Sequence, residues 1–268
     1  MRSKHAALAV LVIVTSVAAQ WSAALNLPIS AGAYTAPGGV SSSGLRFWMD
    51  SAETAALRQN PRVQFWFDKS GEARNLSSVP FGVVPYATAV SSRQQVVFEN
   101  GAMAIGRSIP LNGLTAFFVI RGGLDAGYHP LLGRIDRATG IIVDTKRLRS
   151  MNGGGSVLSG IFGSINSSGI VMIRMNVAAT DYVSLNGGTE YSFSYSSSES
   201  ATHVGAIYSS TGTRLLRASI SEVLVWDRAL SAAERTSVLR ALGAKWGVTV
   251  PSRHEGLTLR RDQQSRWR

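Results

Sequence analysis

The chain has 268 residues, of which 45% are hydrophobic and 16% are charged, and its formal net charge is +11. This composition can supply one sizeable core, and a β-rich chain of this length can form a single domain. There is no cysteine, which excludes disulfides, iron–sulfur clusters and thiol chemistry.

Positive charge is concentrated at the two ends. Arg2 and Lys4 lie in the first nineteen residues, and five arginines lie in residues 251–268. The body between them is moderately basic and lacks the dense stripe of a nucleic-acid-binding protein. We therefore predict no nucleic-acid partner. The preference for arginine over lysine has two interpretations: genome composition, or binding of an anionic polysaccharide through guanidinium forks.

Residues 1–19 have the layout of a secretory signal peptide, with a basic start, an apolar run and small residues before Gln20. The apolar run is too short for a transmembrane helix. We expect a secreted, periplasmic or cell-surface protein without a stable membrane span after leader cleavage; an uncleaved anchor is the alternative. Residues 20–44, rich in Ala, Ser, Gly and Pro, are predicted to form a flexible arm.

After residue 44 the sequence shows many short strand patterns separated by Gly, Asn and Ser. The predicted strands include 114–121, 140–144, 170–177, 182–185, 189–193 and 204–208. Asn186-Gly187-Gly188 predicts a hairpin turn, because Asn and Gly adopt positive φ at low cost. A short helix is a further possibility at 51–58.

The segment 220–248 begins as a strand that is apolar on both faces, as expected inside a layered domain. Ser231 and Glu234 then form a capping box that starts a helix. The helix carries an apolar face, with Trp246 as its expected anchor on a sheet. Many strands and one terminal helix predict an all-β, antiparallel two-sheet sandwich over 45–250. A basic disordered tail follows at 251–268.

Three segments resemble a known family. Leu45–Asp50, Val63–Gly71 and 220–248 resemble the concanavalin A-like lectin/glucanase (laminin-G-like) domains of bacteria and phages. The resemblance covers roughly residues 40–248 and implies a jelly roll with one docked helix. It assigns a structural role to Trp48, Asp50, Trp66, Asp68, Gly71, Glu222, Trp226, Ser231, Glu234 and Trp246. The resemblance leaves the function of the chain open, because this fold occurs in glycan binders, glycosidases, adhesion modules and virion parts.

Catalytic residues are not evident. A glycosidase needs two carboxylates about 5–10 Å apart, which a strand provides through acids at i and i+2 or i+4. The glucanase motif Glu-x-Asp-x-x-Glu is absent, and Glu222 is the only acid on its strand. We therefore predict that the chain is not an enzyme and that Glu222 is a structural, hydrogen-bonded residue.

Metal sites are also not indicated. The four histidines are far apart, without zinc spacing. Asp68 and Asn75 are weak calcium candidates, but their loop offers too few of the six to eight oxygens that calcium takes. An Asx turn, with Gly71 at positive φ, is the favoured interpretation.

The candidates for glycan contact are aromatic or basic residues near predicted loops. They are Tyr128, His129, Arg134, Lys146, Arg147, Arg149 and Tyr208. Aromatic rings stack on sugars and basic groups bind acidic ones. The alternative for the basic residues is a solvated rim without a ligand.

These observations favour an exported, non-catalytic, lectin-like module that binds carbohydrate, including anionic polysaccharide, at a cell surface or in a matrix. One alternative is a structural or attachment protein of a virion or surface layer, docked on neighbouring subunits. Another is a divergent glycoside hydrolase or lyase. No cofactor is expected, apart from the calcium possibility.

Overall fold

The computed structural model describes residues 35–59, 62–90, 92–122, 127–144, 147–152, 155–161, 168–175, 180–193, 199–209 and 212–251. The predicted signal peptide, the first part of the predicted arm, the tail after Pro251 and Lys146 lie outside these ranges. All structural statements below concern the described residues.

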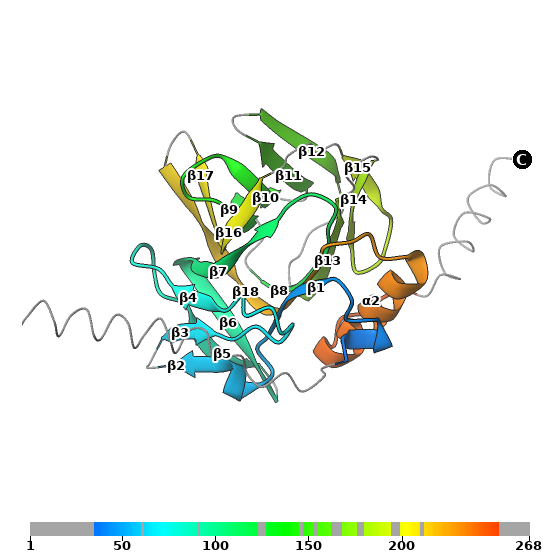
Figure 1. Cartoon of the computed structure of the whole chain (residues 1–268), viewed down its shortest axis with the longest axis horizontal. Coiled ribbons are helices and arrows are strands. Elements are labelled where there is room, and N and C mark those ends of the chain that lie inside the picture. The colour runs from blue at the N-terminus through cyan, green and yellow to red at the C-terminus, as the bar shows by residue number, and fades with distance from the viewer. Residues whose placement is uncertain are drawn as a thin grey trace, which may run out of the picture.

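The described strands form two antiparallel sheets of nine strands each (Figure 1). Sheet A contains β1 (Leu45–Asp50), β5 (Tyr86–Val90), β6 (Arg93–Gly101), β8 (Thr115–Arg121), β13 (Ser168–Arg174), β14 (Asp181–Leu185), β15 (Tyr191–Phe193), β17 (Ala206–Ser209) and β18 (Gly212–Trp226). Sheet B contains β2 (Leu57–Gln59), β3 (Val63–Trp66), β4 (Leu76–Ser78), β7 (Met103–Pro110), β9 (Tyr128–Gly133), β10 (Thr139–Asp144), β11 (Arg147–Asn152), β12 (Gly155–Ile161) and β16 (Ser200–Val204). The predicted all-β, two-sheet architecture is confirmed.

The centre of sheet A is buried on both faces. Phe118 and Ile120 of β8 point into the core between the sheets, whereas Phe117 and Val119 point into a second core. Helix α2 (Ala232–Trp246) covers this second core and packs beside β13 and η1 (Pro37–Gly39), as Figure 1 shows. Alternation along β8 thus places successive side chains in two different cores.

The strand predicted from residue 220 is the end of β18, and its two-sided burial is confirmed. Val223 and Val225 belong to the core between the sheets, and Leu224 and Trp226 belong to the core under α2. β18 lies between β8 and β6 and also pairs with β1 and β17. This central position explains why the strand carries apolar side chains on both faces.

Helix α2 begins and ends as its sequence predicts. The Ser231 hydroxyl accepts a bond of 3.3 Å from the Glu234 amide, and the Glu234 carboxylate accepts one of 2.8 Å from the Ser231 amide. Gly247 ends the helix in the left-handed conformation, at φ 68°. No helix in the described ranges is long and apolar enough to span a membrane.

Two local expectations are corrected. Instead of a helix over 51–58, the chain forms one short 3-10 turn, η2 (Thr54–Ala56), and then enters β2. The described part of the predicted arm is not free of the domain, because Ala36 and Val40 are buried under α2. Gly38 lies so close to the helix backbone that a Cβ would collide with the Ser237 carbonyl. The folded domain therefore begins before residue 45.

Candidate functional site

Glu222 lies on the face of β18 that α2 covers, and its side chain is fully buried. Its carboxylate accepts the indole N–H groups of Trp48, at 2.8 Å, and Trp246, at 2.6 Å. The Lys245 ammonium donates a third bond, at 2.8 Å. One carboxylate thus joins β18, β1 and α2, which agrees with the structural role predicted for Glu222.

A second carboxylate lies beside it. Asp50 of β1 is the Cα partner of Glu222, and its Oδ2 contacts Lys245 Nζ at 2.8 Å and Lys69 Nζ at 3.0 Å. Lys69 also pairs with Glu53. Because Lys245 contacts an oxygen of each acid at 2.8 Å, those two oxygens are no more than twice that distance apart. We call Asp50, Glu53, Lys69, Glu222 and Lys245 the carboxylate cluster.

The surroundings shift the pKa values of Asp50 and Glu222 in opposite directions. Burial, followed by the charge of Asp50, raises the pKa of Glu222. Burial also acts to raise the pKa of Asp50, but the ion pairs with Lys245 and Lys69 outweigh it, so that the pKa of Asp50 is lowered. The separation suits acid–base chemistry, yet the side chains of Asp50 and Glu222 are 4% and 0% exposed. The cluster therefore fastens α2 to sheet A, and its two buried acids, Asp50 and Glu222, are accessible to no ligand in this conformation.

Glu222 is the only acid on its own strand, as the sequence shows, but the structure places Asp50 of β1 beside it. The two residues meet across two strands that are distant in sequence. Sequence spacing cannot show such a pair.

Asp68 forms the predicted turn. Its carboxylate accepts the backbone N–H groups of Trp48, Ser70 and Arg74, each at 2.9 Å, and Gly71 has a φ of 86°. The Asn75 amide oxygen accepts the Asp68 N–H at 2.9 Å. Hydrogens that point at these oxygens would repel a cation, so the residues do not fit calcium. Within the described ranges, no group of three His, Asp or Glu side chains is placed to hold a metal.

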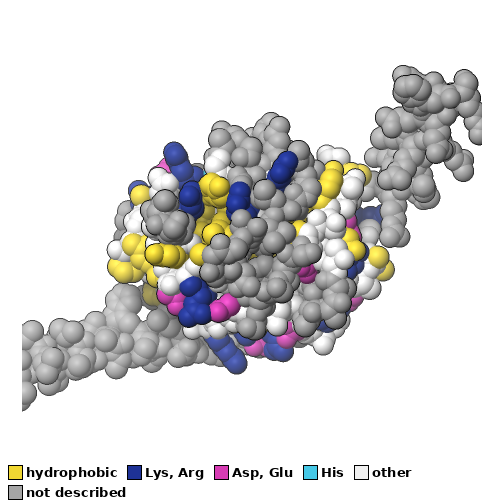
Figure 2. Space-filling view, turned by 90° about the horizontal axis from the view of Figure 1, so that it is seen from above, with side chains coloured by type: hydrophobic (Ala, Val, Ile, Leu, Met, Phe, Trp, Pro, Cys, Tyr) yellow, Lys and Arg dark blue, Asp and Glu magenta, His cyan; other side chains and the backbone are white. Residues whose placement is uncertain are grey.

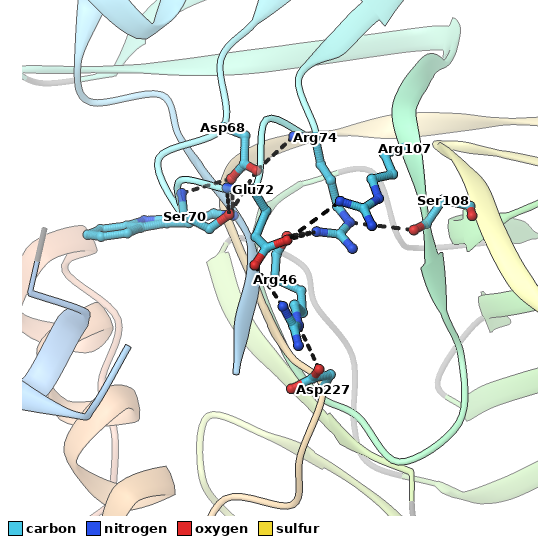
Figure 3. A network of polar contacts seen from close by, with 9 residues as sticks. Arg46, Asp68, Ser70, Glu72, Arg74, Arg107, Ser108 and Asp227 are labelled. Carbon is cyan, nitrogen blue, oxygen red and sulfur yellow. Dashed lines mark hydrogen bonds and ion pairs between the residues drawn. The ribbon is translucent and has the colours of Figure 1, made fainter. Parts of the chain in front are cut away.

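A network of arginines borders this turn (Figure 3). The Glu72 carboxylate contacts Arg46 at 2.7 Å, Arg74 at 2.9 Å and Arg107 at 4.0 Å. Arg46 also contacts Asp227 at 2.6 Å. Figure 3 shows the Glu72 carboxylate joined by dashed lines to the guanidinium groups beside it. Because the Glu72 carboxylate already provides a negative charge for these three arginines, we assign no ligand to this network.

Two of the predicted glycan-contact residues meet in space. The Arg149 guanidinium lies 5.0 Å from the centre of the Tyr128 ring. Arg214, which the sequence analysis missed, lies 4.1 Å from the same centre. We call Tyr128, Arg149 and Arg214 the arginine–tyrosine cluster. Two guanidinium groups therefore contact the Tyr128 ring in this structure, and its stacking on a sugar stays a prediction. Arg214 gave no sequence signal, since it reaches Tyr128 from a strand 86 residues further along.

The remaining predicted residues are dispersed. Arg134 is paired with Asp136 at 2.5 Å, and this hydrogen bond lowers the pKa of Asp136 to about 2. Tyr208 is 41% exposed on β17. Arg147 is exposed at the start of β11, and Lys146 lies outside the described ranges. His129 is only 4% exposed, which corrects the expectation of an exposed ring.

His129 nevertheless lines an open groove of about 670 Å³. The groove is formed by β6, the ends of β8 and β18 and the start of β9, and its lining residues are Val97, Phe98, Glu99, Asn100, Arg121, Gly122, His129, Arg217, Ala218 and Ser219. Arg121 donates to the Trp246 carbonyl at 2.9 Å, so the groove begins where α2 ends. Glu99, Asn100 and Arg217 are exposed. These side chains provide hydrogen-bond donors and acceptors on one surface.

Figure 2 shows the molecule from above. Lys and Arg side chains stand among hydrophobic ones over much of the described surface in this view, and acidic side chains gather towards its lower edge.

No protein-family model matches the chain, and no curated protein sequence matches it. Similar solved structures include a Trypanosoma rangeli sialidase in complex with the inhibitor DANA, with a TM-score of 0.49 and 14% identity over 85% of this chain and 38% of that chain. The binding domain of botulinum neurotoxin serotype C1 gives a TM-score of 0.45 and 10% identity over 74% of this chain and 52% of that chain. The binding domain of botulinum neurotoxin DC in complex with SialylT gives a TM-score of 0.44 and 10% identity over 75% of this chain and 52% of that chain.

This chain spans less than two thirds of each of these structures. With TM-scores below 0.5, the function must be argued from the chain's own residues. One prediction is corrected here: the chain cannot be classed as a non-enzyme. The similar structures include sialidases, which are enzymes, and a missing motif on one strand did not exclude a pair of acids across two strands.

Proposed function

We propose that the chain binds a carbohydrate in the groove between β6, β8, β18 and β9. The observation that carries this proposal is the lining of the groove, in which arginine, asparagine, glutamate and serine side chains share one surface. Sites for drug-like ligands are lined mostly by apolar and aromatic groups. A lining this polar suits a ligand with many hydroxyl groups, because each hydroxyl both donates and accepts a hydrogen bond.

The size of the groove is consistent with this ligand class. Ligand sites in proteins measure about 300–1,000 Å³, and this groove measures about 670 Å³. The concanavalin A-like family suggested by Leu45–Asp50, Val63–Gly71 and residues 220–248 is a further part of the proposal, as is export directed by residues 1–19. The virion or surface-layer alternative stays a prediction without a supporting contact in the described ranges.

The test is binding of the purified full chain to an array of neutral and acidic oligosaccharides, followed by calorimetry on the best ligand. Arg217→Ala removes an exposed guanidinium from the groove and is expected to weaken binding about tenfold or more, the usual effect of losing a charged hydrogen bond. Arg240→Ala, which removes an exposed arginine from α2, is the control and should bind as the unaltered chain does.

Two results would overturn the proposal: absence of binding to every oligosaccharide, or equal binding by the Arg217→Ala variant. The same samples are assayed for released reducing sugar. Release would add a reaction to the binding proposed here and would direct attention to Asp50 and Glu222, which lie side by side on β1 and β18.

A further inference from the structure

Two exposed groove residues of opposite charge face each other across neighbouring strands. Glu99 of β6 is the Cα partner of Arg217 of β18, and both line the groove. Phe98 and Ala218, which precede and follow them on these strands, belong to the core between the sheets. Because successive side chains of a strand point to opposite faces, Glu99 and Arg217 share the face of sheet A that points away from this core. Directly opposite residues have Cβ atoms about 4.5–5.5 Å apart.

The Glu99 carboxylate is held in place by a tyrosine. Tyr86 of β5 donates its phenolic O–H to Glu99 at 3.0 Å. The Arg62 guanidinium lies 5.1 Å from the centre of the Tyr86 ring and donates to the Val84 carbonyl at 3.3 Å. One hydroxyl occupies only part of the acceptor capacity of a carboxylate. Glu99 is therefore positioned from the side of β5 and keeps lone pairs for a ligand.

The two charges do not close onto each other. No ion pair joins Glu99 to Arg217, and neither residue forms one with any other residue that the structure describes. Both side chains are exposed. The wall of the groove thus presents an acceptor-only group beside a donor-only group, and a ligand can approach both at once.

Two hydroxyl groups on adjacent carbons fit such a pair. A hydroxyl both donates and accepts hydrogen bonds, so one can donate to Glu99 while its neighbour accepts from Arg217. Both bonds involve a charged protein group and are therefore stronger than bonds between neutral groups. A carboxylate or an ammonium group on the ligand would be attracted by one residue and repelled by the other. It would gain little from the pair and would lose hydration on binding.

We infer that Glu99 and Arg217 form a subsite for a vicinal diol on an uncharged sugar ring, with Tyr86 as the positioning residue for Glu99. The inference rests on the proposed function and narrows the ring seated at this pair to a neutral sugar. A ring that carries a carboxylate or an ammonium group is disfavoured there.

The experiment compares oligosaccharides that differ in charge. Calorimetry measures binding of the full chain to three hexamers of the same ring configuration and linkage. One is neutral, one is a hexuronate that keeps the diol, and one is a hexosamine in which an ammonium group replaces one hydroxyl of the diol. Such trios are compared in the gluco, manno and galacto series. In the trio that binds best, we expect the neutral hexamer to bind more tightly than either charged one.

Two charge-removing variants should act in opposite directions. Glu99→Gln and Arg217→Gln each weaken binding of the neutral hexamer, because a charged hydrogen-bonding group is replaced by a neutral one. Relative to the neutral hexamer, Glu99→Gln should favour the hexuronate and Arg217→Gln the hexosamine. The expected change is about fourfold, the effect of one unit charge at roughly 5 Å in water. Glu190→Gln, which alters a carboxylate paired with Arg235, and Arg240→Gln are the controls and should change no affinity.

A double-mutant cycle tests the role of Tyr86. Tyr86→Phe removes the O–H that donates to Glu99 and should weaken binding of the neutral hexamer. In a Glu99→Ala background the same change should have no further effect, because the group that Tyr86 positions is already absent. Equal losses in both backgrounds would show that Tyr86 acts on the ligand by another route and would overturn its positioning role.

The outcomes separate the two proposals. A hexuronate or hexosamine that binds more tightly than its neutral counterpart overturns the diol subsite and leaves carbohydrate binding in place. The same holds if Glu99→Gln and Arg217→Gln shift the charge preference in the same direction or not at all. Absence of binding to every hexamer and to every other oligosaccharide overturns carbohydrate binding itself. If only an oligosaccharide outside these trios binds, its charge and the two variants decide in the same way. Circular dichroism confirms that each variant is folded.

Discussion

The outer face of sheet A has two unlike halves. Under α2, the strands carry Trp48, Phe117 and Leu224, and the buried carboxylates of Asp50 and Glu222 lie among them. Beyond the C-terminal end of α2, residues of β6, β8 and β18 line the polar groove together with His129 of β9. β18 passes through both halves, with Glu222 in the first and Arg217 in the second.

The difference shows how one strand can serve both stability and recognition. Charges taken out of water must be paired within the protein, because an isolated buried charge is very costly. Glu222 meets this requirement with three donors. Charges left in water need no such partner, so Arg217 remains available for a ligand. Coverage by α2 therefore separates a structural half from an exposed half, for which we propose ligand binding; we call the latter the binding half.

The largest expected effect comes from deleting Glu222. Glu222→Ala removes the carboxylate that accepts the indole N–H groups of Trp48 and Trp246, and it leaves Lys245 with Asp50 as its remaining partner. The free energy of unfolding should fall by about 3–5 kcal/mol. Urea unfolding monitored by tryptophan fluorescence measures the change. The Glu190→Ala variant, which loses the partly exposed pairs with Arg174 and Arg235, is the control and should lose about 1 kcal/mol or less. Comparable losses in the two variants would contradict the division into two halves.

The next largest expected effect is a pH dependence of the free energy of unfolding, which arises from Asp50. Its lowered pKa means that the unfolded chain binds a proton more readily than the folded chain does. The stabilisation is present above the unfolded value near 3.8 and is lost as pH falls through the lower folded value. The effect should be smaller than deletion of Glu222, because a protonated Asp50 still offers acceptor oxygens.

Urea unfolding at intervals from pH 5 downwards tests this expectation. Asp50→Asn removes the titrating group, and its unfolding free energy should fall less steeply below pH 4 than that of the unaltered chain. Parallel curves for the two proteins would show that Asp50 is not the source of the dependence.

The sequence predicts the local features of both halves and few of their long-range contacts. Alternation in β18 and the Ser231–Glu234 capping box are encoded within a few residues, so strand, helix and two-sided burial follow from pattern alone. The hydrogen bond between Trp48 and Glu222 joins residues 174 positions apart. It depends on the pairing of β1 with β18, which no local pattern specifies.

The binding half was harder to predict for the same reason. The sequence analysis could identify the aromatic and basic candidates Tyr128, Arg147 and Arg149 from their residue types. Arg214 contacts Tyr128 only because β18 lies beside β9 in the fold. The groove was not predicted at all, since Glu99, Arg121 and Arg217 come from three strands that are adjacent only in the folded sheet.

A smaller effect is expected at the start of the covering helix. Ser231→Ala removes the hydroxyl that accepts the Glu234 amide, and such a cap contributes about 1 kcal/mol. Urea unfolding should show a loss of this size. Ser231→Asp keeps an acceptor and should restore most of the stability. Failure of aspartate to do so would mean that the serine acts through contacts other than the cap.

The smallest expected effect sharpens the contrast along β18 itself. Arg217→Ala lies five residues from Glu222, yet its guanidinium is exposed in the groove. Surface substitutions of this kind change the free energy of unfolding by about 0.5 kcal/mol or less. Urea unfolding of Arg217→Ala should therefore overlay that of the unaltered chain, while carbohydrate binding is weakened about tenfold or more. A loss as large as that of Glu222→Ala would mean that the open half also holds the fold together, because only a side chain with structural partners can cost so much when it is removed.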